Sequence, residues 1–92
     1  MANEKIKRDW LVRATDIFNG LEVNVIYNAP SVRKFLRKKC NDSISVPTTE
    51  KLLMAIIEAQ DRGLEFKINN KSLKLILKDS ATSDKLYELI EV

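Results

Sequence analysis

The chain contains no histidine, one cysteine, two glycines and two prolines in 92 residues. Histidine is the commonest general base and a common metal ligand, so its absence excludes Ser-His-Asp and Cys-His catalytic sites and the usual structural zinc sites. Two isolated glycines also exclude a glycine-rich phosphate loop and the cofactors that such a loop binds. We therefore expect a non-enzymatic protein with no metal site and no cofactor.

Cys40 is the single cysteine, so no disulfide can form within the chain. No apolar run approaches the ~20 residues that a membrane span needs, and the N-terminal residues have no apolar signal core. Together these absences predict a cytoplasmic protein in a reducing compartment, with no membrane partner. Cys40 is expected to be a buried, unreactive thiol, because it falls on the apolar side of a predicted helix over residues 31–40.

Apolar residues make up 45% of the chain and charged residues 32%, which is ordinary for a globular protein. The length predicts a single domain over residues 1–92. The net charge of +3 is unevenly distributed, because residues 1–40 carry nine Lys and Arg against four Asp and Glu, whereas residues 41–92 carry seven against nine. The N-terminal half is therefore the expected site of contact with an acidic partner.

The spacing of apolar residues predicts one α+β domain with the element order α-β-α-(β)-α-β-β-α. Helices are expected over 4–18, 31–40 and 48–62, and from Ser83 through Leu86, Leu89 and Ile90; strands are expected over 21–27, 64–69 and 73–78, with a short one over 43–46. Gly20 is expected to end the first helix in the left-handed conformation. The last two strands should form a β-hairpin around Asn69-Asn70, since asparagine tolerates the positive φ angles of a tight turn.

The succession helix, strand, helix, helix, hairpin resembles that of the winged-helix family, which is one alternative for the fold. The resemblance implies DNA binding in which the second helix of the pair, here residues 48–62, enters the major groove with polar and basic side chains. That segment is the most apolar helix of this chain, and residues 21–27 are long for the first strand of that family. These two features favour the other alternative, a mixed or antiparallel sheet with helices on one face.

Residues 31–40 carry five Arg and Lys, and no acid lies between Asn28 and Asn41. Apolar residues recur at helical spacing, so this helix should bury one side and expose a positively charged face. Two arginines four residues apart are suited to bidentate hydrogen bonding with phosphate groups. The apolar side comprises Val32, Phe35, Leu36 and Cys40, and the candidate binding residues are Arg33, Lys34, Arg37, Lys38 and Lys39, with Arg33 and Arg37 as the phosphate grip.

We expect this basic helix to bind the phosphate backbone of DNA or RNA, which would make the chain a small regulatory protein. The alternative is a protein-binding inhibitor or adaptor whose basic face docks on an acidic protein surface. A third interpretation attributes the charges to solubility, with the last cations stabilised by the helix dipole. The apolar segment 48–62 is expected to be a central core helix, or else to join two copies of the chain as a homo-oligomer.

Overall fold

The structure, a computed structural model, describes residues 2–79 and 85–92, with side chains for residues 10–79 and 85–92. The described part of the chain forms three helices and four strands: α1 (Ala2–Gly20), β1 (Ile26–Asn28), α2 (Ala29–Cys40), α3 (Val46–Asp61), β2 (Phe66–Ile68), β3 (Lys71–Asp79) and β4 (Leu86–Glu91). The strands pair antiparallel in the order β1-β4-β3-β2. The predicted α+β class is therefore confirmed, and the sheet is antiparallel rather than mixed.

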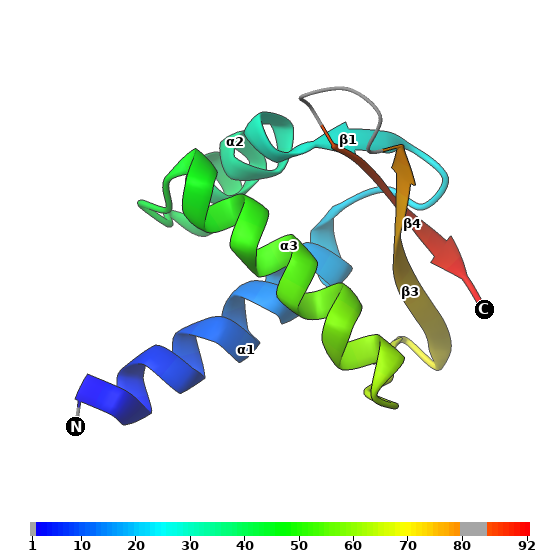
Figure 1. The fold of residues 1–92 in the computed structure, drawn as a ribbon, viewed down its shortest axis with the longest axis horizontal. Coiled ribbons are helices and arrows are strands. Elements are labelled where there is room, and N and C mark those ends of the chain that lie inside the picture. The colour runs from blue at the N-terminus through cyan, green and yellow to red at the C-terminus, as the bar shows by residue number, and fades with distance from the viewer. Residues whose placement is uncertain (1, 80–84) are drawn as a thin grey trace.

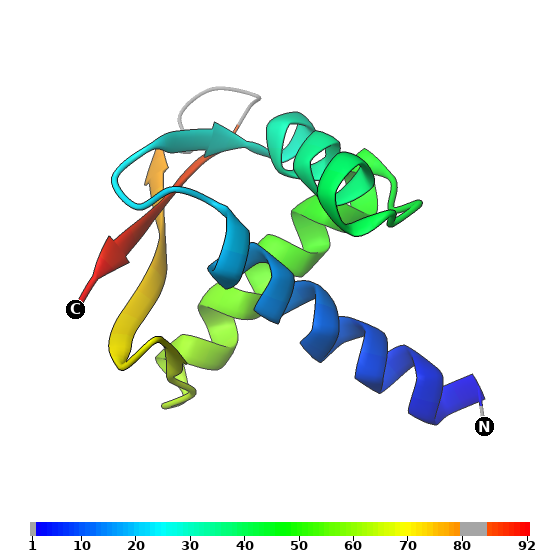
Figure 2. The same cartoon turned by 180° about the vertical axis from the view of Figure 1, so that it is seen from behind.

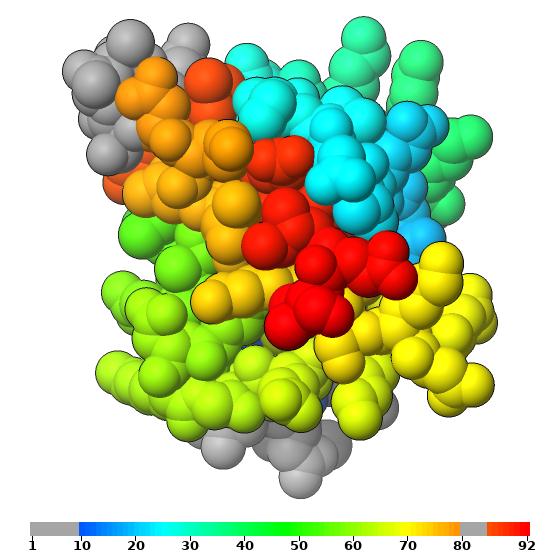
Figure 3. Space-filling view, turned by 90° about the vertical axis from the view of Figure 1, so that its right-hand side faces the viewer, coloured from blue at the N-terminus to red at the C-terminus, as the bar shows by residue number. Residues whose placement is uncertain are grey.

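The three helices lie on one face of the sheet (Figures 1 and 2). None of the described helices lies on the other face, and Figure 3 shows β4 crossing the middle of that face between β3 and β1. In both ribbon views the N-terminal end of α1 extends beyond the other elements, on the opposite side of the molecule from the C-terminus. This arrangement leaves one inner layer, between helices and sheet, where apolar side chains can be buried.

All three helices and the sheet contribute to this inner layer. Phe66 of β2 is half-buried and stacks on Phe18 of α1, with the ring centroids 4.1 Å apart. The buried apolar residues are Ala14, Ile17, Phe18 and Leu21 from α1 and the residue after it, Ala29, Val32 and Leu36 from α2, Ile44, Leu52, Leu53 and Ile56 from α3 and the segment before it, and Leu73, Leu75, Tyr87 and Leu89 from the sheet.

The hairpin predicted around Asn69-Asn70 is confirmed. Both asparagines have positive φ angles, 53° and 67°, and Ile68 pairs with Lys71 across the two-residue turn. Asparagine reaches this conformation more easily than most residues, which is why the pair marks the turn in the sequence.

Gln60 of α3 completes the hydrogen bonding of β3 beyond the short strand β2. β2 pairs only with residues 71–73 of β3, so among the described residues no strand pairs with Leu75 on that side. The Gln60 side chain takes its place: Nε2 donates to the Leu75 carbonyl at 2.8 Å, and Oε1 accepts from the Leu75 N–H at 2.9 Å. These two bonds fix α3 along the sheet and satisfy backbone groups that would otherwise be unpaired.

The helix predicted near the C-terminus is wrong, because Leu86–Glu91 forms β4. Leu86, Leu89 and Ile90 fit helical spacing, but Tyr87 and Leu89 also alternate, and both are fully buried. Periodicity alone cannot distinguish helix from strand in a short apolar run. Pairing with β1 on one side and β3 on the other decides the outcome. Ser83, the expected N-cap, lies outside the described residues.

The short strand predicted over 43–46 is also wrong. Val46 is the first residue of α3, and Ser45 is its N-cap, whose Oγ accepts from the Thr48 N–H at 3.3 Å. A serine before Pro47 is a strong helix start, and this signal overrides the short alternation. The predicted order is therefore replaced by α-β-α-α-β-β-β.

Of the strand predicted over 21–27, only the end is regular. Ile26–Asn28 forms β1, whereas Asn24 has a φ angle of 67°, which interrupts the extended conformation. The Asn24 N–H donates to the Leu89 carbonyl at 2.8 Å. The segment after α1 therefore joins β4 at this hydrogen bond before the regular strand β1 begins.

Gly20 ends α1 as predicted, but not in the left-handed conformation. The glycine with a positive φ angle is Gly63, at 105°, just after α3. Position 20 requires glycine because there is no room for a side chain: a Cβ atom there would overlap the ring of Phe35. Phe35 therefore packs directly on the backbone of α1, and this contact sets how closely α1 and α2 approach.

Gly20→Ala is expected to destabilise the fold by about 1–3 kcal/mol, because the new methyl group must displace the Phe35 ring. Chemical unfolding measures the loss, which should appear even though alanine has the higher helix propensity. The control is the same change in a Phe35→Leu background, where the shorter side chain should remove most of the effect. An equal loss in both backgrounds would contradict the role assigned to the ring.

Candidate nucleic-acid interface

An asparagine defines each end of α2. Asn28 precedes the helix, and its Oδ1 accepts a hydrogen bond from the Ser31 N–H at 2.9 Å. Asn41 follows it in the left-handed conformation, with a φ angle of 52°, and its N–H donates to the Leu36 carbonyl. The helix predicted over 31–40 is confirmed, and its capped ends fix where it starts and stops.

One side of α2 is buried, as the apolar spacing predicted. Val32 and Leu36 have no exposed surface. Phe35 and Cys40 are half-buried at the edges of the same side and pack against the core. This burial fixes the rotation of α2 about its axis and so decides which of its residues reach solvent.

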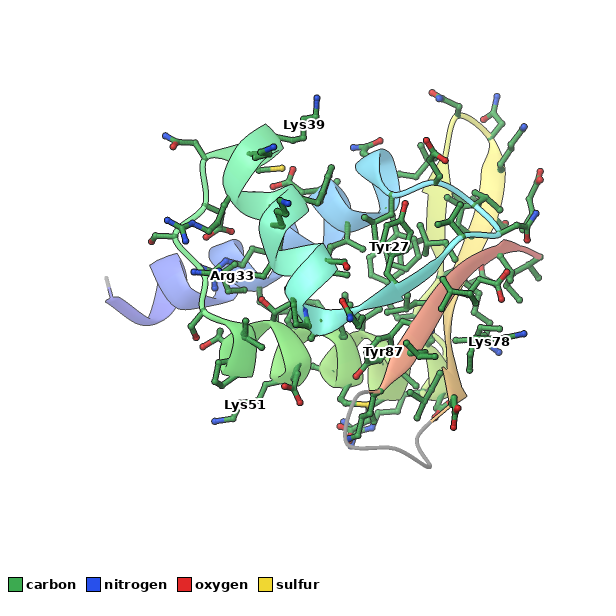
Figure 4. The ribbon with its side chains drawn as sticks, turned by 90° about the horizontal axis from the view of Figure 1, so that it is seen from above. Tyr27, Arg33, Lys39, Lys51, Lys78 and Tyr87 are labelled. Carbon is green, nitrogen blue, oxygen red and sulfur yellow. The ribbon has the colours of Figure 1, made fainter. Side chains whose placement is uncertain are left out.

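α2 carries four exposed cations, which we name the basic surface: Lys34, Arg37, Lys38 and Lys39. The first three lie on the side opposite Val32 and Leu36, and Lys39 lies at the C-terminal end of the helix. Figure 4 shows Lys39 projecting away from the helix into solvent. Within the part of the chain whose side chains are described, no acid lies in ion-pair contact with any of the four. A group of cations without acids attracts phosphate groups by charge alone.

Arg33 does not lie on this exposed side. It is half-buried, and its Nε donates to the Ile44 carbonyl at 3.3 Å. Figure 4 shows the side chain directed toward the segment that joins α2 and α3. Arg33 and Arg37 therefore do not form the exposed pair that their spacing suggested, and a contact of Arg33 with phosphate stays a prediction.

The basic surface lowers the stability of α2 on its own. Lys34 and Lys38 are four residues apart, and like charges at this spacing destabilise a helix by about 0.2–0.5 kcal/mol. Arg37, Lys38 and Lys39 occupy the last turn, where the helix dipole offsets part of the repulsion. No acid within α2 relieves the rest. A bound polyanion would supply the missing negative charge.

The apolar segment predicted over 48–62 forms α3, which is a core helix with Thr49, Leu52, Leu53 and Ile56 buried. Its exposed side carries three acids and two cations, so it is acidic on balance. One of the cations, Lys51, projects into solvent in Figure 4. A homo-oligomer through α3 stays a prediction. The exposed charges of α3 and the residue after it are Glu50, Lys51, Glu58, Asp61 and Arg62.

An ion pair that we did not predict joins α1 to the residues after α2. Arg13 donates through Nε and Nη2 to the two carboxylate oxygens of Asp42, each at 2.8 Å. The two side chains are 28% and 15% exposed. No local sequence pattern connects positions 29 residues apart, so this contact is visible only in three dimensions.

Neither a metal-binding cluster nor a membrane-spanning helix is found among the described residues. Among the residues with described side chains, no three His, Cys, Asp or Glu gather into a group that could hold a metal ion. No helix in the described ranges is both long and apolar enough to cross a membrane.

Comparison of the chain with models of protein families, with curated proteins and with solved structures found no match. Its function is therefore inferred from its own residues.

Cys40, at the C-terminal end of α2, is half-buried rather than fully buried. Burial raises the pKa of the Cys40 thiol, and the carboxylate of Asp16 raises this pKa further by its charge and by accepting a hydrogen bond. The thiolate is the reactive form of cysteine, so a raised pKa lowers its reactivity near neutral pH.

Native Cys40 should react slowly with a chromogenic disulfide reagent, and its reactivity should rise only at a higher pH than that of the unfolded chain. Stopped-flow labelling across the alkaline range, with the protein in denaturant as reference, measures both effects. Asp16→Asn should shift the rise to lower pH, whereas Asp61→Asn, a change at an exposed acid, should not. Rapid labelling at neutral pH would contradict the environment described for the thiol.

Proposed function

We propose that this domain is a non-enzymatic regulatory protein that binds nucleic acid by contacting the phosphate backbone with the basic surface of α2. The observation that carries the proposal is a set of four exposed cations on a helix without acids. Burial of Val32 and Leu36 turns Lys34, Arg37 and Lys38 toward the opposite, exposed side of the helix. Backbone contact needs charge and geometry rather than base-specific side chains, and its strength falls steeply with salt.

The order of the elements supports a winged-helix-like interpretation of the fold. α1, β1, α2 and α3 are followed by β2, β3 and β4, and β4 lies between β1 and β3 in the sheet. In the winged-helix family the second helix of the pair enters the major groove. The corresponding helix here is α3, whose exposed side is acidic on balance. We therefore assign backbone contact to α2 and no base contact to α3.

The alternative function is that of an inhibitor or adaptor whose basic surface docks on an acidic protein. The exposed acids of α3 favour this alternative, because Glu50, Glu58 and Asp61 would repel a duplex that lay across both helices. The two functions differ in the partner that neutralises the basic surface, and binding measurements with a defined duplex separate them.

Lys34→Gln, Arg37→Gln and Lys38→Gln, combined in one variant, should abolish most binding to a duplex of about 20 base pairs. Four phosphate contacts predict a slope of log K against log salt of about −3.6 for the wild type. Each contact removed should make the slope less negative by about one. Fluorescence anisotropy at several salt concentrations measures affinity and slope together.

The matched control removes three exposed lysines from β2 and β3, as Lys67→Gln, Lys71→Gln and Lys74→Gln. It changes the net charge equally and should keep the wild-type slope. A wild type that binds no duplex, or an equal loss in both variants, would rule out nucleic-acid binding through α2. Nuclease-resistant capture of an acidic protein by the wild type, lost in the α2 variant, would support the alternative.

Lys34→Glu should weaken duplex binding while stabilising the fold by about 0.5 kcal/mol, because a carboxylate four residues before Lys38 replaces a repulsion by an attraction. Chemical unfolding and anisotropy on the same preparation measure the two effects. Lys67→Glu, at an exposed position of β2, is the control for net charge. A variant that is less stable, or that binds as tightly as the wild type, would contradict the view that Lys34 serves a ligand.

A further inference from the structure

The ion pair between Arg13 and Asp42 is unlike the other ion pairs of the described side chains. Both of its hydrogen bonds are 2.8 Å long, whereas Lys71–Glu91 and Lys78–Glu88 are single contacts at 3.9 Å and 3.3 Å. Two parallel bonds between a guanidinium and a carboxylate are strong and directional. Partial burial also protects the pair from screening by salt.

Asp42 is the first acid after the basic run of α2. Its N–H donates to the Leu36 carbonyl at 3.1 Å, which holds its backbone beside the last turn of the helix. That turn carries three of the four cations of the basic surface. A free carboxylate at this position would be a counter-ion within a few residues of those cations, beside Asp16, which already lies against Cys40 of the same turn. In the structure both of its oxygens are bound by Arg13 instead.

We propose that Arg13 keeps the basic surface available to a polyanion by binding both carboxylate oxygens of Asp42, which neutralises this acid beside the last turn of α2. This inference rests on the proposed function and deepens it. Arg13 is a positioning residue that acts through Asp42 and does not itself contact phosphate. Loss of Arg13 removes a positive charge and releases a negative one beside the basic surface, whereas loss of both side-chain charges leaves the net charge of the protein unchanged.

The test is a double-mutant cycle with Arg13→Met, Asp42→Asn and their combination, each titrated with the duplex of about 20 base pairs. Arg13→Met should weaken binding about three- to tenfold and make the salt slope less negative. Asp42→Asn should bind as tightly as the wild type or a few-fold tighter, since it removes only the acid. The combined variant should return to within about twofold of the wild type, and this recovery is the distinguishing result.

Two results would overturn the proposal. A combined variant as weak as Arg13→Met would mean that Arg13 affects binding by a route other than Asp42, and Arg13→Met with wild-type affinity would mean that Asp42 has no influence on the basic surface. Thermal unfolding checks that each variant is folded. If Arg13→Met does not fold, because one charge is left half-buried and unpaired, the combined variant decides: wild-type affinity supports the proposal, and a loss above about tenfold overturns it.

The α2 variant described above separates this proposal from the proposed function. If that variant binds the duplex as tightly as the wild type, binding does not occur through α2 and both proposals fail. If the α2 variant loses binding while the three variants at Arg13 and Asp42 all bind like the wild type, only the role of Arg13 fails.

Discussion

The short connection between α2 and α3 is the constraint on which the arrangement of the helices depends. Residues 41–45 must reverse the chain between two helices whose apolar sides face the same core. The left-handed conformation of Asn41 makes the turn possible. Arg13 from α1 and Arg33 from α2 then bind this segment through its acid and through one of its carbonyl groups. Contacts from two helices therefore hold a segment that has no regular structure of its own.

The direction of the basic surface follows from this constraint. With α2 capped at both ends and buried along Val32 and Leu36, its remaining positions must face solvent, and most of them are cations. A small domain has only a few kcal/mol of stability to lose. Repulsion among the cations of the basic surface therefore lowers the free energy of unfolding by a measurable amount, and a bound polyanion would offset this loss. Arg33 differs from these cations, because it is half-buried and its Nε donates to the Ile44 carbonyl, as a half-buried guanidinium needs hydrogen-bond acceptors.

Local sequence signals were sufficient to predict an element wherever turn residues or a long, regular apolar spacing marked it. The asparagine pair at 69–70 predicted the hairpin, and the apolar spacing predicted α1, α2 and α3 to within a few residues. Prediction failed where a segment was short and fitted two periods. Residues 86–91 fit both a helix and a strand, and they form a strand because two neighbouring strands supply its hydrogen bonds. β3 directly precedes β4, but β1 is far away in the sequence, so no short window around β4 contains both of its partners.

Residue spacing over one or two turns is enough to predict the class of the fold, the positions of the three helices and an amphipathic helix with a basic face. Which charges remain exposed and which are bound internally depends instead on the packing of distant elements. Arg13, Arg33 and Asp42 look like ordinary surface charges in the sequence, yet each is bound in three dimensions. The physical reason is that burial and hydrogen bonding depend on which elements meet, and such meetings join residues that no local pattern relates.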